Sequence, residues 1–337
     1  MQSRSLSILR FLAVLALLSA GCGGPERDPD APSKPISTPQ LIYEDITLTQ
    51  ARPDGGILWR LQARLAEYES PPENGAAPVQ LGSAHLQSVQ GEFFDEDNRA
   101  IRTRAERGSA YPGERRLELM GQVEVESERD NLRLQAQRVE WLPEQRRLQA
   151  EGQVKVELLD GQGSLWGDRL LVDFGQAQMQ LENLDPTQPV RAEYRTPSRR
   201  HDQDPDLELT ASRFLWQFGV GEVQAVGAVE VYAPLQALRL RGGQLRAPLP
   251  FAVRDSGTES LLRLLDNAEA KAEQTGQELE AQEIRWRIGS TQLQAQGNVR
   301  YRQPGQALTV RGNQGILDWQ ANTARIQGNS QTQLTLP

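Results

Sequence analysis

The chain has 337 residues, a formal charge of −8, two histidines and one cysteine. An acidic balance without a basic cluster argues against a nucleic-acid-binding protein, and a single cysteine excludes disulfides within the chain. His85 and His201 have no neighbours at the spacing of metal ligands, so the sequence predicts neither a metal site nor another cofactor.

The N-terminus has the layout of a secretory signal. Arg4 and Arg10 precede an apolar run over residues 11–18, and small residues follow up to Cys22. The end of this segment resembles a bacterial lipoprotein cleavage site, which predicts removal of residues 1–21 and lipidation of Cys22. The alternative is an ordinary signal or a short membrane anchor with an inert thiol. Residues 22–40 are rich in Pro, Asp and Ser and are predicted to form a flexible tether.

A five-point pattern then occurs eight times along the body of the chain. Apolar or small residues fall at positions 0, +2, +4, +7 and +9, apart from a few polar outer points such as Thr103 and Gln277, and the third is always Ala or Gly. The best copy is Leu132, Leu134, Ala136, Val139 and Trp141. Four of the seven spacings between the small residues are 31 residues long, which indicates a repeat architecture. The small residues of the other copies are Ala63, Ala105, Gly167, Ala211, Gly242, Ala281 and Gly312.

Steps of two along this pattern are typical of a β-strand with one buried face. The step of three between +4 and +7 would turn the following apolar residues to water unless the strand contains one extra residue. The pattern therefore predicts a β-bulge or bend between +4 and +7 of each copy. The small residue at this point is expected to pack closely against a neighbour.

A second signature, Gly-x-Val-x-Val, precedes the small residue by fifteen positions. It begins at Gly121, Gly152, Gly227 and Gly297, with a degenerate copy at Asp266. Each 31-residue unit is thus predicted to be two antiparallel strands joined by polar turns, such as residues 128–131 and 143–146. The fold class is all-β. Residues 261–280, which could be taken for a helix, fit the strand repeat and are predicted as strand.

The apolar faces of such hairpins must be covered, either by a second sheet in a sandwich or by curling of one long sheet into a jelly roll. Four copies of the pattern lie in residues 41–181 and four in residues 207–337. Residues 182–206 contain several Pro residues and are interpreted as a loop or hinge between two halves, although one continuous sheet with a long insertion is the alternative. Shorter loops are predicted at residues 70–78 and 248–259.

The succession of Gly-x-Val-x-Val and Leu-x-Leu-x-Ala-x-x-Val-x-Trp resembles the repeats of the lipopolysaccharide-transport β-jelly-roll proteins, the LptA/LptC/OstA-like group. Residues 45–48, 54–59, 89–94 and 117–125 narrow the resemblance to the LptC family. The resemblance covers residues 41–181, and residues 207–337 resemble the family's repeats more generally. It implies an antiparallel, OstA-like open β-jelly roll built from repeated hairpins, or two such jelly-roll halves in succession.

The function implied by this resemblance is that of a non-enzymatic periplasmic lipid carrier. Such a protein receives lipopolysaccharide from the subunits of an inner-membrane ABC transporter and holds the acyl chains in an apolar trough. It passes the lipid to another β-jelly-roll bridge protein by edge-strand pairing. The chain would lie on the periplasmic side of the cell envelope, anchored by its lipid to the inner membrane. It departs from the family in its lipid anchor, which replaces a transmembrane helix, and in its greater length.

Eight inward-facing residues are predicted to line the trough. The alternative is that they form only a dry core, in which case the protein is a structural or adhesive cell-envelope lipoprotein. A hydrolase is disfavoured because the sequence offers no nucleophile and base in a plausible arrangement. The predicted lining residues are Val123, Val125, Leu132, Leu134, Val139, Trp141, Val154 and Val156.

Overall fold

The computed structural model describes residues 41–52, 55–69, 82–94, 100–128, 131–196, 204–217, 220–248, 261–303 and 308–334. The predicted signal, Cys22 and the predicted tether lie outside these residues. Within the described ranges, no helix has the length and apolar character that crossing a membrane requires.

The described residues form twenty β-strands and two short 3₁₀ helices. The 3₁₀ helices are η1 (Pro143–Gln145) and η2 (Pro234–Gln236). The strands are β1 (Leu41–Ala51), β2 (Ile57–Glu69), β3 (Ser83–Phe94), β4 (Ala100–Tyr111), β5 (Arg116–Ser127), β6 (Leu132–Leu142), β7 (Arg147–Leu158), β8 (Gly163–Asp173), β9 (Gln178–Glu182), β10 (Val190–Tyr194), β11 (Leu207–Ala211), β12 (Arg213–Gln217), β13 (Glu222–Ala233), β14 (Leu238–Pro248), β15 (Leu261–Ala272), β16 (Glu278–Arg287), β17 (Gln292–Gln303), β18 (Leu308–Asp318), β19 (Thr323–Gln327) and β20 (Gln331–Leu334).

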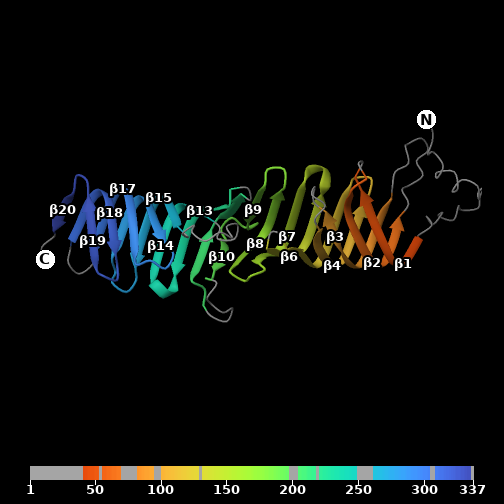
Figure 1. Ribbon diagram of the computed structural model, residues 1–337, viewed down its shortest axis with the longest axis horizontal. Coiled ribbons are helices and arrows are strands. Elements are labelled where there is room, and N and C mark those ends of the chain that lie inside the picture. Colours follow the sequence, from red (N-terminus) through yellow and green to blue (C-terminus); the bar gives the residue numbers. More distant parts are fainter. Residues whose placement is uncertain are drawn as a thin grey trace, which may run out of the picture. The chain divides into compact units, whose positions relative to one another are not determined.

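All twenty strands belong to one antiparallel sheet, in which each long strand pairs with the next one along the chain (Figure 1). This confirms the predicted all-β fold of repeated hairpins. Residues 261–280 form β15 and the first part of β16, so the prediction of strand there is also confirmed.

The pairing register shifts once near the middle of most hairpins. Between β5 and β6, Met120 pairs with Arg138 and Val123 pairs with Ala136. Two residues, Gly121 and Gln122, therefore lie opposite Gln137 alone. Both have positive φ, 76° and 43°, which is the left-handed region that glycine tolerates best. This is a β-bulge with two left-handed residues, and the repeated glycine of the Gly-x-Val-x-Val signature forms its first position.

The register shift lies where the pattern predicted it, but the extra residue lies in the facing strand. The prediction placed it in the strand that carries the small residue, and that detail is wrong. The physical reason is conformational, because no residue between +4 and +7 of the strands β4, β6, β8 and β18 has positive φ. A sixth bulge with two left-handed residues, at residues 328–329, was missed by sequence reasoning because no Val-x-Val follows it. The other bulges are Gly152–Gln153, Gly227–Ala228, Asp266–Asn267 and Gly297–Asn298.

The small residues of the pattern sit where the backbone approaches a neighbouring strand. A Cβ atom on Gly167 would lie 2.9 Å from Leu181 Cδ1, and one on Gly242 would lie 2.9 Å from Leu264 Cγ. At Gly312 the nearest atom would be Ile326 Cγ2 at 2.5 Å. A larger residue at these positions would displace core side chains, so the expected close packing is present.

Residues 182–206, predicted as a loop or hinge, contain the strand β10, and the sheet continues across this region. Arg191 of β10 pairs with Trp166 of β8 on one side and with Thr210 of β11 on the other. On β8, Arg169 pairs with Glu182 of β9, so residues 183–189 occupy the place that a two-residue bulge occupies elsewhere. The break in the repeat is thus an enlarged bulge within a continuous sheet.

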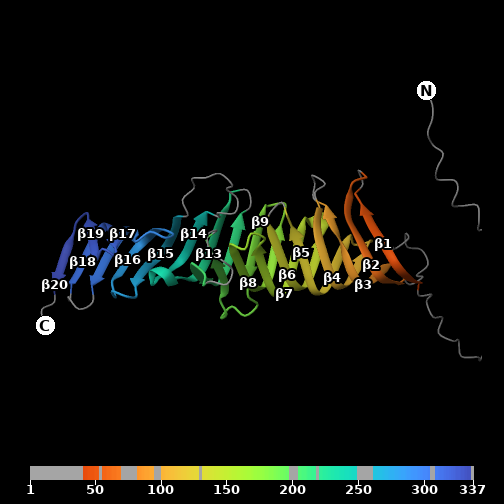
Figure 2. The same cartoon turned by 60° about the horizontal axis from the view of Figure 1, so that its bottom comes forward.

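The strands bend at the bulges, so that their two halves lie in two facing layers (Figure 1 and Figure 2). Phe93 of β3 and Trp141 of β6 show this arrangement, because their ring centroids are 5.9 Å apart although β4 and β5 separate the two strands in the sheet. The inward-facing apolar side chains form one connected cluster that extends from Trp59 on β2 to Trp319 after β18. The interior is therefore continuous along the sheet.

The outward face of the strands carries ion pairs between neighbouring strands. Arg138 on β6 contacts Glu118 on β5 at 2.5 Å and Glu151 on β7 at 3.4 Å, and Arg263 on β15 contacts Glu283 on β16 at 2.9 Å. Such exposed pairs contribute little stability, so the fold depends mainly on the buried face.

Replacement of a bulge glycine tests this account. Gly152 has φ 78°, and a Cβ there would lie 2.6 Å from Gln137 Oε1. We expect Gly152→Ala to destabilise the β6–β7 pair by about 1–2 kcal/mol, the cost of a left-handed non-glycine residue, measured as faster amide hydrogen exchange in β6 and β7. Gly152→Asn should cost less, because asparagine tolerates this conformation. Wild-type exchange in both variants would contradict the bulge account.

Candidate functional site

The eight predicted lining residues all lie on β5, β6 and β7 and face the interior. Val123, Val139 and Val154 are each 1% exposed, and Leu132 and Trp141 are partly buried and packed against the same cluster. The structure therefore brings all eight into one apolar surface. Whether they contact a lipid remains a prediction.

An aromatic cluster closes the space between the layers near the ends of β3 and β6. The ring of Trp141 lies 5.9 Å from Phe93 and 5.4 Å, edge to face, from Phe174. Such tilted and edge-to-face contacts are favourable for aromatic pairs. Side-chain packing of these three rings closes the gap between the layers here.

An apolar cavity of about 130 Å³ lies farther along the same interior, where the repeat is interrupted by residues 183–189 and the short strands β9–β12. We call this interruption the seam. Small residues at its wall, such as Ala192, Gly163 and Ala247, leave part of the space between the layers unfilled. Of the predicted lining residues, only Leu132 and Val156 reach it. The remaining wall comes from Leu158, Leu165, Tyr194, Leu207, Leu209, Phe214, Trp216, Val223, Leu245, Pro248, Leu262 and Ile288.

Sequence reasoning missed most of this wall because it concentrated on the best copy of the repeat. The inward phase of β12 and β13 already marked Phe214, Trp216 and Val223 as interior. Their proximity to Leu132 and Val156, however, depends on how the two layers face each other across the seam. The pairing of strands within neighbouring hairpins does not reveal which side chains meet between the layers.

The polar groups around the cavity are arranged to leave its wall apolar. Burial raises the pKa of Tyr194, and the carboxylates of Asp206 and Asp160 raise it further, so its hydroxyl is neutral at physiological pH. Asp206 is 6% exposed and accepts a hydrogen bond of 2.7 Å from the backbone N–H of Thr196. Glu157, Ser164 and Glu193 also line the cavity, but they alternate with the inward-facing Val156, Leu165 and Ala192, so their side chains belong to the outer face. An alkyl chain suits this cavity better than a charged group does.

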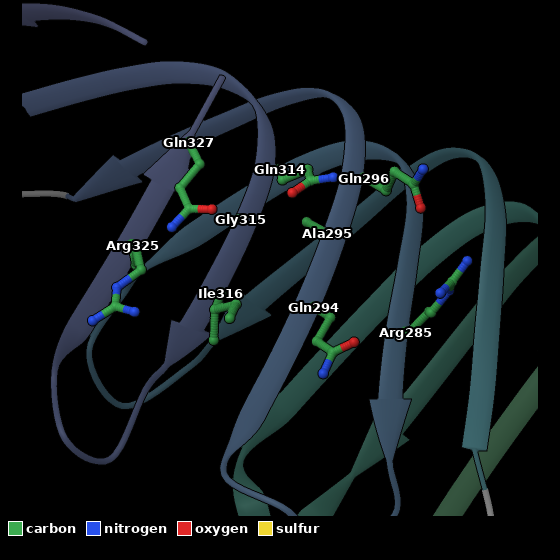
Figure 3. A pocket seen from close by; sticks show the side chains of 9 residues that line it. All are labelled: Arg285, Gln294, Ala295, Gln296, Gln314, Gly315, Ile316, Arg325 and Gln327. Atoms are coloured by element: carbon green, nitrogen blue, oxygen red, sulfur yellow. The ribbon is translucent and has the colours of Figure 1, made fainter. Parts of the chain in front are cut away.

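A second hollow, of about 300 Å³, lies on the outward face of β16–β19 and is polar (Figure 3). Gln294, Gln296, Gln314 and Gln327 surround it, with guanidinium groups of Arg285 and Arg325 at its borders. Its lining cannot shield an alkyl chain from water, so it is not part of the apolar site.

A serine, a histidine and a glutamate meet on the outward face of β2, β3 and β4. His85 Nδ1 lies 3.1 Å from Ser109 Oγ, and His85 Nε2 lies 3.7 Å from Glu69 Oε2. Ser109 is only 4% exposed, so its hydroxyl is inaccessible to a substrate, and His85 lines neither the apolar cavity nor the polar hollow on β16–β19. His201 lies outside the described residues. Among those residues, no cluster of His, Cys, Asp and Glu has an arrangement that could bind a metal ion.

Comparison with known proteins gives a family match over the first part of the chain. The model of a family described as "Lipopolysaccharide-assembly, LptC-related" matches residues 8–183, just over half of the chain. Comparison with the curated proteins finds no match.

One similar solved structure is the crystal structure of LptH, the LptA homologous periplasmic component of the conserved lipopolysaccharide transport device from Pseudomonas aeruginosa. Its sequence identity to this chain is 10% and the TM-score is 0.32. The similarity covers 39% of this chain and 95% of that chain.

The cavity can be tested by filling it. Ala192 borders the cavity, whereas Ala150 on β7 is 0% exposed and packed on all sides. We expect Ala150→Leu to destabilise the protein by about 1–3 kcal/mol through overpacking, and Ala192→Leu to be close to neutral. The midpoint of urea unfolding measures both. Equal losses in the two variants would mean that no free space exists beside Ala192.

Proposed function

This chain belongs to the LptC-related family of lipopolysaccharide-assembly proteins, and we propose that it is a non-enzymatic periplasmic lipid carrier. It receives lipopolysaccharide from an inner-membrane ABC transporter, holds the acyl chains between its two β-layers and passes the lipid toward the outer membrane. The observation that carries this proposal is the continuous apolar interior from β2 to the end of β18, with unfilled space at the seam.

The energetics of lipid transfer require such an interior. Exposing an alkyl chain to water costs about 0.8 kcal/mol per methylene, so a chain of about twelve carbons costs roughly 10 kcal/mol. A carrier must therefore shield the chain along its whole path. Inward-facing residues of successive hairpins supply that shielding without any catalytic group, and the energy for movement would come from the transporter.

The apolar cavity, at about 130 Å³, is smaller than the roughly 300–1,000 Å³ typical of ligand pockets. Loading therefore requires the two layers to separate. The ladder hydrogen bonds run along the sheet between neighbouring strands, whereas the packing of Phe93 on Trp141 closes the gap between the layers at that point. The layers can move apart there without loss of strand pairing.

Both ends of the sheet offer an edge for strand addition by a partner. Among the described residues, β1 pairs only with β2, and β19 and β20 pair only with β18. Leu41, Ile42 and Tyr43 on β1 are 46%, 59% and 46% exposed, which favours a protein contact at that end. Pairing with the transporter or with another β-jelly-roll protein would cover these edges and extend the apolar path.

The second half of the chain continues this path. The strands β11–β18 follow the same strand and bulge pattern, and their buried side chains belong to the same cluster as those of β2–β8. We propose that this half supplies part of the bridge that a separate protein otherwise provides in the family.

Attachment to the inner membrane through Cys22 is part of the proposal and concerns residues outside the described ranges. If Cys22 carries the lipid, mass spectrometry of the mature N-terminal peptide should show an acylated cysteine, and Cys22→Ala should leave residues 1–21 uncleaved. A free Cys22 thiol in the mature protein would rule out the lipid anchor but would not contradict the carrier proposal.

Site-specific photo-crosslinking in cells tests carriage itself. We expect benzoylphenylalanine at Leu132 or Trp216, on the cavity wall, to crosslink lipopolysaccharide. The matched outward positions Gln135 and Gln217 are exposed and should give at least tenfold less product, since an apolar interior excludes the lipid from the outer face.

Absence of crosslinks from both inward positions, together with no lipid in organic extracts of the purified full chain, would reject the carrier. The protein would then be a structural or adhesive envelope lipoprotein with a closed core.

A further inference from the structure

We propose that a hollow on the outer surface beside the cavity binds the sugar headgroup of the same amphiphile whose alkyl chains enter the cavity. This inference rests on the proposed function and assigns a second, polar half to its site. The hollow has a volume of about 400 Å³. Its lining residues are Arg133, Lys155, Glu157, Leu158, Leu159, Gly161, Ser164, Trp166, Glu193 and Arg195.

The hollow and the cavity lie on opposite faces of the same three strands, β7, β8 and β10. Because strand residues alternate between faces, Val156, Leu165 and Ala192 line the cavity while Lys155 and Trp166 line the hollow. Glu157, Leu158, Ser164 and Glu193 line both spaces. Because β7 ends at Leu158 and β8 begins at Gly163, a molecule with an apolar part inside and a polar part outside would pass around this end of the β7–β8 hairpin.

Trp166 supplies an apolar platform on the outer face. It pairs with Lys155 of β7 and Arg191 of β10, and their charged groups lie 5.7 Å and 5.5 Å from the centre of its ring. These contacts hold the indole between two cations while it remains partly exposed. The carbon face of a sugar ring can pack on such an aromatic surface.

The polar groups of the hollow form pairs of opposite charge. Lys155 contacts Glu157, Glu193 lies between Arg191 and Arg195, and Arg133 contacts Glu124 and Glu126 of β5. The charges nearly balance, so the hollow does not select strongly for an anion. It presents cationic donors, carboxylate acceptors and the Ser164 hydroxyl side by side. Sugar hydroxyl groups, which both donate and accept hydrogen bonds, match this mixture.

The polar hollow of Figure 3 lacks this combination. Its lining contains no aromatic residue, and it shares no residue with the apolar cavity. An amphiphile held in the cavity at the seam therefore has its headgroup beside Trp166 and not beside Gln294 or Gln314.

Equilibrium binding to the full-length protein in detergent tests the inference. Three probes separate the contributions: an acylated glucosamine disaccharide lipid, phosphatidylglycerol, which has alkyl chains but no sugar, and the deacylated disaccharide. We expect Trp166→Ala to weaken binding of the sugar lipid by about fivefold to tenfold, the scale of one aromatic contact, and to leave phosphatidylglycerol unchanged. The deacylated disaccharide should bind weakly, because it lacks the alkyl contribution.

Matched variants control for general effects. Tyr232 on β13 also faces outward beneath a cation, with Arg239 at 4.9 Å, so Tyr232→Ala should change neither affinity. Lys155→Ala should weaken the sugar lipid only, whereas Lys271→Ala, which removes a similar outward lysine paired with Glu278, should not. Unchanged urea midpoints would show that the variants fold.

The outcomes distinguish the two proposals. If the wild-type protein binds both acylated lipids and Trp166→Ala affects both or neither, the headgroup site is rejected and the carrier proposal stands. Tight binding of the deacylated disaccharide with no binding of either lipid would overturn both, because the hollow would then serve a free saccharide. Failure of all three probes to bind would also reject both.

Discussion

The structure depends on one backbone constraint, the pairing of two left-handed residues in one strand with a single residue in the next. At Gly121–Gln122 and its equivalents this mismatch bends the sheet and corrects the phase of the side chains. Without it, the apolar residues that follow each bend would face water. The repeated mismatch lets each strand contribute to two layers and keeps one apolar face inside both.

The continuous interior and the proposed function follow from this repetition. Each hairpin adds the same apolar positions to the same interior, so the apolar interior becomes longer with every additional hairpin. Packing closes the space at Phe93, Trp141 and Phe174, whereas small residues leave it partly empty at the seam. Since alkyl chains need shielding and not bond-making chemistry, a repeat of this kind suits the proposed transport without a catalytic centre.

At the seam the regular repeat is interrupted, but the sheet is not. Residues 183–189 replace a two-residue bulge, and short strands β9–β12 replace two long ones. Pairing continues through β8, β10 and β11, so the enlarged bulge does not divide the sheet. The apolar cavity and the outer hollow around Trp166 both lie beside this interruption and share four lining residues, which is why we place both halves of an amphiphile there.

The sequence by itself determined the strands of the repeat, their inward phase, the position of the register shifts and the shared apolar surface of Val123, Leu134, Val139 and Val154. These features depend on residues close together in the chain, where a period of two and a repeated glycine are visible. Only the tertiary structure decided which strand carries the extra residue, that β10 bridges the seam, and that Phe214 and Trp216 face Leu132 across a cavity. The reason is physical: the space left between two layers depends on the contact of side chains distant in sequence, and no local pattern records which of them meet.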